Sequence, residues 1–234
     1  CDTVLAALLG KLDEASIDHE LTAGGWRQID VWRAERCLAF PAESTTIIPQ
    51  ELMASLAGQL RGKDAIVSTD VGQHQMWAAQ YLQFDQPRRW LTSGGAGTMG
   101  YGLPAAIGAQ VAHPDKLVVC VTGDGSILMN VQELATAVQH GINVVAIVFN
   151  DGAYGNVRRM QRESYGNRVI ASDLTNPDFV RLADSFGVFA RRATDPDGLQ
   201  DALDLALAQD APAVIEVKVG EFPDPWRHIV LPRV

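Results

Sequence analysis

The chain has few cysteines, few prolines and no long apolar run, and each shortage excludes a class of protein. Its three cysteines form no CxxC pair and lack metal-ligand spacing, which indicates reduced thiols, with Cys120 expected in the core. No apolar stretch approaches the ~20 residues of a membrane-spanning helix, and the first residues lack a secretory signal pattern. With 11 prolines and no biased tract, a disordered or fibrous protein is also excluded. We therefore expect a soluble, cytoplasmic protein.

Positive charge is also in the minority. The sequence has 19 basic and 28 acidic residues, a formal net charge of −9. A field of that sign repels phosphate backbones and anionic lipid headgroups, so we expect neither a nucleic acid nor a membrane as partner. Hydrophobic residues make up 47% of the 234 residues, which is enough for a substantial core.

The start of the chain indicates the trimmed end of a longer protein. An apolar helical stripe over residues 4–12 begins without an initiator methionine. Residues 13–48 carry scattered charges and few periodic signals, as expected of a connecting arm. We therefore divide the chain into residues 1–48, the tail of a preceding domain and a linker, and residues 49–234, the main domain with a C-terminal extension.

Beyond Pro49, short apolar runs alternate with helical segments. Buried parallel strands are predicted at residues 65–68, 117–121, 144–149, 188–190 and 213–217. Helices are predicted at residues 50–60 and 127–140, and a further one begins with Asn176 as its N-cap and Pro177 in its first position. This alternation predicts an α/β fold, a doubly wound and mostly parallel sheet with helices on both faces.

Unusual residues follow two of the predicted strands. Gly123-Asp124-Gly125 and Asn150-Asp151 would meet at one edge of the sheet, where ligands of such folds gather. Two carboxylates that converge there need a cation, and Mg²⁺ binds carboxylates together with phosphate oxygens. Taken alone, the glycine-rich turn could equally serve only to reverse the chain.

Other motifs leave alternatives open. Residues 95–100 match GxGxxG, so a nicotinamide-dependent dehydrogenase is a competing hypothesis, although residues 88–92 form a weak strand and Asn150-Asp151 stays unexplained. His74 could contact a phosphate or cap a loop. Arg158, Arg159 and Arg162 could hold a substrate carboxylate or form a solvated helix face.

The combined motifs resemble those of a known family. Gly123-Asp124-Gly125 followed by Asn150-Asp151 is similar to the GDG…NN signature of thiamine-diphosphate enzymes, and residues 70–77 and 93–104 look like the acetolactate synthase branch. The resemblance covers about residues 45–220. It implies the thiamine-diphosphate-binding fold and the C-terminal, cofactor-binding domain of an acetolactate synthase, pyruvate oxidase or benzoylformate decarboxylase relative.

The resemblance also implies a role for each matching position. Mg²⁺ would be held by Asp124, Asp151 and the backbone carbonyl of Ala153. The Gly97 carbonyl would accept a bond from the aminopyrimidine, and Met99 would wedge the cofactor into its bent, reactive form. The remaining cofactor contacts are implied at Val71, Gly72, Gln73, His74, Gly123, Gly125, Ser126, Tyr154 and Gly155.

Two departures qualify the implied activity, which is decarboxylation or carboligation of a 2-oxo acid. The family usually has asparagine at position 151, and authentic acetolactate synthases have tryptophan at position 160, where this chain has Met160. Tyr154-Gly155 instead resembles benzoylformate-decarboxylase-like members. A noncatalytic module that keeps the fold is a third hypothesis. Against it argue the intact residues Gly97, Met99, Asp124 and Asp151.

The implied partner is a second domain. In the family, the glutamate that protonates the pyrimidine belongs to a separate N-terminal domain, usually of a neighbouring subunit, and the sequence has no counterpart of it. The glutamate-bearing domain would come from an absent upstream part of the same chain or from a partner subunit, and a homo-oligomer is expected.

Overall fold

A computed structural model describes residues 1–14, 19–35, 38–40 and 47–220. Cys37 and the expected extension beyond residue 220 lie outside the described residues. The chain divides into two compact units, Cys1–Ala39 and Phe40–Val234. Ile47, which precedes the expected boundary at residue 48, is fully buried within the second unit.

The first unit contains two helices, α1 (Asp2–Glu14) and α2 (His19–Ala34). The apolar stripe predicted α1, whereas α2 lies in the segment expected only as a connecting arm. Large apolar side chains stay exposed on both helices, among them Leu9 at 61% and Trp32 at 58%. Neither helix therefore buries its apolar residues within this unit.

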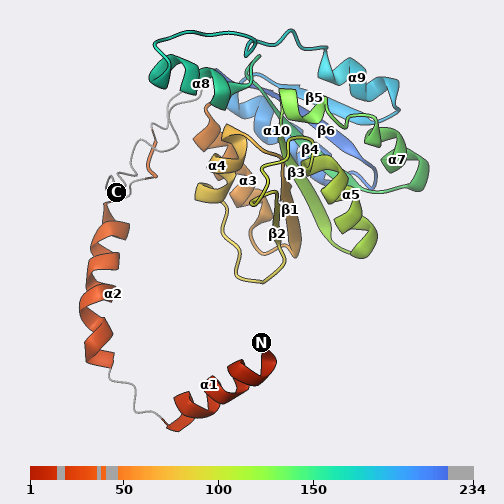
Figure 1. Cartoon of the computed structure of the whole chain (residues 1–234). Helices are drawn as coiled ribbons and strands as arrows, with labels where there is room; N and C mark the ends of the chain where they lie inside the picture. The colour runs from red at the N-terminus through yellow and green to blue at the C-terminus, as the bar shows by residue number, and fades with distance from the viewer. Residues whose placement is uncertain (15–18, 36–37, 41–46, 221–234) are drawn as a thin grey trace. The chain divides into compact units, whose positions relative to one another are not determined.

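The second unit is built on six parallel strands (Figure 1). They are β1 (Ala65–Thr69), β2 (Trp90–Thr92), β3 (Leu117–Gly123), β4 (Val144–Asn150), β5 (Phe189–Ala193) and β6 (Ala213–Lys218). Their order in the sheet is β2-β1-β3-β4-β6-β5. From β1 the chain adds one strand on one side and all later strands on the other, so the direction of winding switches between β1 and β3. Ligands of open parallel sheets bind at such a switch point.

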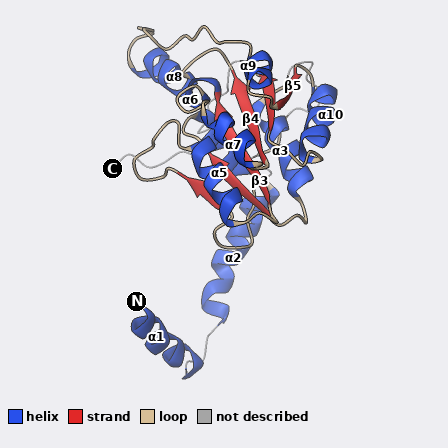
Figure 2. Cartoon of the chain, turned by 90° about the vertical axis from the view of Figure 1, so that its right-hand side faces the viewer, coloured by secondary structure: helices blue, strands red, loops and turns tan. Residues whose placement is uncertain are grey.

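Helices cover both faces of the sheet, which confirms the predicted fold class (Figure 2). Alternate residues of each strand point to opposite faces. Val119 and Val121 pack in one cluster with α3 (Pro49–Leu60), α4 (Gln73–Tyr81) and α10 (Pro196–Leu207). Val118 and Cys120 pack in the other with α5 (Gly102–Ala112), α7 (Glu133–His140) and α9 (Phe179–Ser185). Both faces are apolar because β3 and β4 are continuous runs of mostly small and β-branched residues.

The prediction of one continuous helix over residues 127–140 is wrong. The short helix α6 (Asp124–Ile127) is followed by turns, and α7 begins only at Glu133. Asn130 lies between them, and its Nδ2 donates a 2.6 Å hydrogen bond to the carbonyl of Gly100. Periodicity identifies the buried face of this segment but does not detect a side chain that bonds to another loop.

Asn176 is not the N-cap that the sequence predicted. The cap of α9 is Asp178, whose Oδ1 accepts hydrogen bonds of 3.1 Å from the backbone N–H groups of Val180 and Arg181. Both side chains are common caps, but the helix starts two residues later than expected. The Asn176 side chain is engaged elsewhere, as described below.

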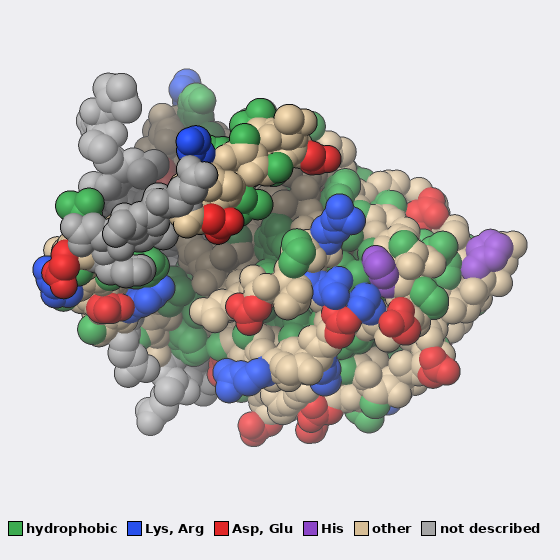
Figure 3. Space-filling model, turned by 90° about the horizontal axis from the view of Figure 1, so that it is seen from below, with side chains coloured by type: hydrophobic (Ala, Val, Ile, Leu, Met, Phe, Trp, Pro, Cys, Tyr) green, Lys and Arg blue, Asp and Glu red, His purple; other side chains and the backbone are tan. Residues whose placement is uncertain are grey.

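The surface carries both signs of charge. On the face seen in Figure 3, acidic and basic side chains lie interspersed. Asp64, for example, pairs with Arg89 at 2.7 Å and with Lys116. None of the helices in the described parts of the chain has the length and hydrophobicity to cross a membrane.

Helix α10 provides a test of the core. Leu203 is fully buried whereas Leu205, two residues away, is 46% exposed. We expect Leu203→Ala to lower the free energy of unfolding by about 2–5 kcal/mol, because it leaves a cavity. Leu205→Ala should change it by no more than about 0.5 kcal/mol. Urea denaturation of both variants checks this, and equal losses would contradict the packing described.

Candidate functional site

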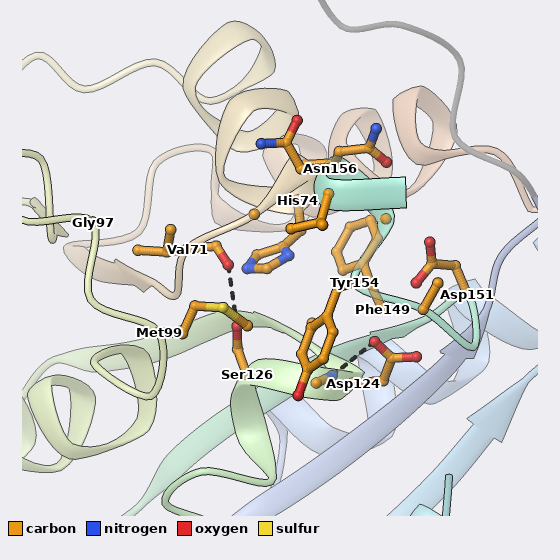
Figure 4. A pocket seen from close by; sticks show the side chains of 17 residues that line it. Val71, His74, Gly97, Met99, Asp124, Ser126, Phe149, Asp151, Tyr154 and Asn156 are labelled. Carbon is orange, nitrogen blue, oxygen red and sulfur yellow. Dashed lines mark hydrogen bonds between the residues drawn. The ribbon is translucent and has the colours of Figure 1, made fainter. Parts of the chain in front are cut away.

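A pocket of about 190 Å³ lies at the carboxyl ends of β1, β3 and β4, next to the switch point (Figure 4). Every residue that the sequence analysis assigned to the cofactor or the metal lines it. These residues are Val71, Gly72, Gln73, His74, Gly97, Met99, Gly123, Asp124, Gly125, Ser126, Asp151, Ala153, Tyr154 and Gly155. They come from four separate loops, and the parallel register of the strands brings them together.

The loop after β1 is tied to the glycine-rich loop by a buried carboxylate. Asp70, 1% exposed, accepts hydrogen bonds from the backbone N–H groups of Val71 at 2.9 Å, Gly100 at 2.8 Å and Gly102 at 3.1 Å. A Cβ atom on Gly102 would lie 2.8 Å from the backbone nitrogen of Asp70, so only glycine allows this approach. Asp70 thereby fixes the loop that carries Gly97 and Met99.

Asp124 is the first residue after β3 and is 2% exposed. Its Oδ1 accepts from the N–H of Gly125 at 2.8 Å, and its Oδ2 accepts from the N–H of Gly152 at 2.8 Å and from Nδ2 of Asn176 at 2.7 Å. Burial raises the pKa of Asp124 above its usual range, and these hydrogen bonds oppose the rise. The carboxylate is thus held in one orientation from three sides.

A second carboxylate, Asp151, lies on the same side of the pocket in Figure 4. Its side chain is 6% exposed, and Nη2 of Arg158 lies 3.7 Å from its Oδ2. Burial and the negative charge of Asp124 raise the pKa of Asp151 to about 7, while Arg158 opposes the rise. Two carboxylates whose pKa values are both raised by burial form a site that a bound cation would stabilise.

The donor set fits Mg²⁺ rather than a metal held by protein side chains alone. Among the described residues, no group of three or more His, Cys, Asp or Glu side chains forms a metal site. Mg²⁺ is commonly bound by one or two carboxylates together with phosphate oxygens and waters. Asp124, Asp151 and the backbone of Ala153 border one pocket and match that pattern.

His74 is 5% exposed at the start of α4, with its ring 6.1 Å from the ring of Phe149. Burial lowers the pKa of His74 to about 4, so the imidazole is neutral at neutral pH. α4 has no side-chain cap, and His74 Nε2 is buried without a hydrogen-bond partner in the part of the chain that the structure describes. The ring lines the pocket and can offer this nitrogen to a ligand.

Two arginines of α8 (Gly155–Ser164) form ion pairs with carboxylates of the same chain. Arg158 contacts Asp151 and also Asp173, the latter at 3.1 Å, and Arg159 pairs with Glu163 at 3.0 Å. The side chain of Arg158 is only 14% exposed, so it is not part of a solvated face. These contacts favour a role in balancing the charge of Asp151 over the binding of a substrate carboxylate.

Four residues at the site were missed by sequence reasoning. Phe149, Asn156 and Val157 line the pocket, and Asn176 bonds to Asp124. The sequence analysis places Phe149 only at the end of a predicted strand. Asn176 carried a signal, an asparagine before proline, but the signal was interpreted as a helix cap.

Comparison with known proteins identifies the family. Residues 70–217 match the family described as "Thiamine pyrophosphate enzyme, C-terminal TPP binding domain". The chain belongs to this family. It is also 42% identical over 221 residues to the acetolactate synthase large subunit of Haemophilus influenzae and 48% identical over 209 residues to the isozyme 3 large subunit of Escherichia coli. A third relative, the acetolactate synthase large subunit of Parasynechococcus marenigrum, is 48% identical over 220 residues.

These matches cover 93%, 88% and 92% of the chain but only 38%, 36% and 35% of the respective relatives. This thiamine pyrophosphate enzyme domain therefore spans little more than a third of their length. The family match and these relatives together confirm the resemblance to the C-terminal cofactor-binding domain of acetolactate-synthase-like enzymes.

The structure confirms the weak strand predicted before the glycine-rich loop. β2 does precede the glycine-rich loop directly, although it has only three half-buried residues at the edge of the sheet. The strand-loop-helix context of residues 90–112 therefore does not exclude a dinucleotide site. The family match, together with Asp124 and Asp151 in one pocket, favours the thiamine cofactor instead.

The raised pKa of Asp151 predicts a pH dependence of the metal-free domain. Between about pH 4 and pH 7 the native state keeps a proton that the unfolded chain has lost, so this group makes stability fall as pH rises. Asp151→Asn removes that fall. We expect its free energy of unfolding, relative to wild type, to increase by up to about 1.4 kcal/mol per pH unit in this window and to level off above it.

Denaturant unfolding of both proteins in a metal chelator from pH 4 to pH 8 measures the difference. His74 has a lowered pKa and makes stability rise between about pH 4 and pH 6.5, but it does so in both proteins and cancels. A difference between the two proteins that does not vary with pH would contradict the raised pKa of Asp151.

Proposed function

We propose that this domain binds thiamine diphosphate through Mg²⁺, with Asp124, Asp151 and the carbonyl of Ala153 as the protein's metal ligands. The observation that carries the proposal is the pair of buried carboxylates at the ends of β3 and β4, which border one pocket in a domain of this family. The diphosphate is assigned to the loops at residues 71–74 and 123–126. Neutral His74 adds no charge there, and in the tautomer that carries its proton on Nε2 it can donate a hydrogen bond to a phosphate oxygen.

The other residues of the pocket are assigned to the organic part of the cofactor. When bound, thiamine diphosphate supplies a carbon nucleophile that can attack the carbonyl of a 2-oxo acid. The Gly97 carbonyl is assigned as an acceptor for the aminopyrimidine and Met99 as its packing support. Asp70 holds their loop in place, and Phe149 contributes an apolar wall that limits water at the site.

The whole protein is proposed to be a 2-oxo acid decarboxylase or carboligase of the acetolactate synthase kind. Its named relatives support this class, and the chain corresponds to little more than a third of their length. The pyrimidine-activating glutamate is assigned to the remaining part of the protein or to a partner subunit, within a homo-oligomer. Met160, which is 44% exposed on α8, stands where authentic acetolactate synthases have a tryptophan, so the choice of acceptor is expected to differ.

Cofactor binding can be tested by calorimetry with thiamine diphosphate and Mg²⁺. We expect Asp124→Ala to weaken binding by more than about tenfold, since it removes a metal ligand. Asp151→Asn should bind as tightly as wild type or more tightly, because it keeps an oxygen ligand and removes one negative charge next to the diphosphate. Asp115→Asn, an exposed change before β3, is the control. Equal losses in the Asp124 and Asp151 variants would refute the charge argument.

The domain alone is expected to be catalytically silent. The pocket holds the proposed metal ligands, but the described residues include no glutamate in it to protonate the pyrimidine. Release of carbon dioxide from pyruvate or benzoylformate, measured with thiamine diphosphate and Mg²⁺, should stay far below about 1 per second. Turnover at that rate by the 234-residue chain would show that no second domain is needed.

A further inference from the structure

Glu216 is a fully buried carboxylate in the middle of β6, outside the pocket. It lies opposite Val148 in the pairing of β6 with β4, two residues from the end of β4. Its Oε1 accepts a 2.6 Å hydrogen bond from Nδ2 of Asn150, the residue before the proposed metal ligand Asp151. A charged residue in the interior of a parallel strand requires specific partners, and Asn150 is one of them.

The hydrogen bonds continue from Asn150 to the second metal ligand. Oδ1 of Asn150 accepts a 3.0 Å bond from Nδ2 of Asn176, and the same Nδ2 donates at 2.7 Å to Oδ2 of Asp124. A carboxylate only accepts hydrogen bonds, so Glu216 requires the NH₂ group of Asn150 to face it. The carbonyl oxygen of Asn150 must then face Asn176, which in turn presents its own NH₂ group to Asp124.

Arg192 on β5 contacts Glu216 and also the segment that carries Asn176. Its Nε donates at 2.7 Å to Oε2 of Glu216, and its Nη2 donates at 2.7 Å to Oδ1 of Asp178, the cap of α9. Asp178 follows Asn176 by two residues. The guanidinium group therefore bridges two carboxylates and holds the segment that carries Asn176 against the strand that carries Glu216.

We propose that Glu216 is a positioning residue for the metal ligand Asp124, acting through Asn150 and Asn176. The inference rests on the proposed function, because it assigns Asp124 to the metal. Glutamine at position 216 would keep the size of the side chain but could offer either an oxygen or an NH₂ group to Asn150. The two asparagines could then reverse, and an oxygen of Asn176 would face Asp124 and displace its carboxylate.

The test is the affinity for Mn²⁺ in the presence of thiamine diphosphate, measured by electron paramagnetic resonance on the full chain. We expect Glu216→Gln and Asn176→Ala each to weaken Mn²⁺ binding by about tenfold. The double variant should lose no more than either single variant, because both interrupt one path. Lys218→Gln is the matched control. It removes a 3.0 Å ion pair with Oε1 of Glu216, the oxygen that also accepts from Asn150, but keeps every side chain of the path, and it should leave the affinity within about twofold of wild type.

Thermal unfolding of the same metal-free proteins separates positioning from simple stabilisation. A lower melting temperature for Glu216→Gln with unchanged Mn²⁺ affinity would overturn the inference. Independent losses of about a hundredfold in the double variant would also overturn it, because the path would not run through Asn176. If the wild-type protein does not bind Mn²⁺, the proposed function itself is overturned. If the wild type binds Mn²⁺ and Glu216→Gln binds it equally well, only the role of Glu216 is overturned.

A second variant covers the case in which Glu216→Gln does not fold. Arg192→Gln changes a side chain that is 35% exposed and leaves the Glu216 side chain in the protein. It removes the ion pairs that hold Glu216 and Asp178, the residue before α9. We expect a loss of Mn²⁺ affinity of at least about threefold from this variant. Wild-type affinity in a folded Arg192→Gln protein would overturn the inference.

Discussion

The site depends on the in-register pairing of β3 with β4. Gly123, the last residue of β3, lies opposite Phe149, one residue before the end of β4, so Asp124 and Asp151, which follow the two strands, border one pocket. A slip of one residue would turn the alternate side chains of β4 to the other face and move Asp151 away from Asp124. The continuous apolar faces of these two strands, packed from both sides, fix the register. The chemistry at the strand ends is therefore set by the core beneath them.

Burying two carboxylates side by side is unfavourable, and the surrounding residues offset this in different ways. Around Asp124 the offset comes from neutral hydrogen-bond donors, two backbone N–H groups and Asn176. At Asp151 it comes from the positive charge of Arg158. Neutral donors direct the Asp124 carboxylate without neutralising it, whereas Arg158 balances the additional charge that aspartate introduces where the family usually has asparagine.

Much of the fold could be predicted from the sequence, because a buried parallel strand is a continuous apolar run and needs no knowledge of its neighbours. β2 could not be predicted with the same certainty, since a half-buried edge strand of three residues has no such run. The roles of Asn176 and Glu216 depend on partners 52 and 66 residues away in the sequence, so no local pattern reveals them. A glutamate inside the predicted strand at residues 213–217 was nevertheless a signal, because an isolated charge in a buried strand requires a partner.

The bonds of Asp70 make the two walls of the pocket unequal in mobility. Separating the loop after β1 from the glycine-rich loop would leave a buried carboxylate without the N–H groups of Val71, Gly100 and Gly102, so this wall opens only at a high free energy. The opposite wall includes the first residues of α8, a helix in which no residue is buried. Local opening is easiest where few contacts are buried. We therefore expect the pocket to open locally at α8 more readily than at the glycine-rich loop.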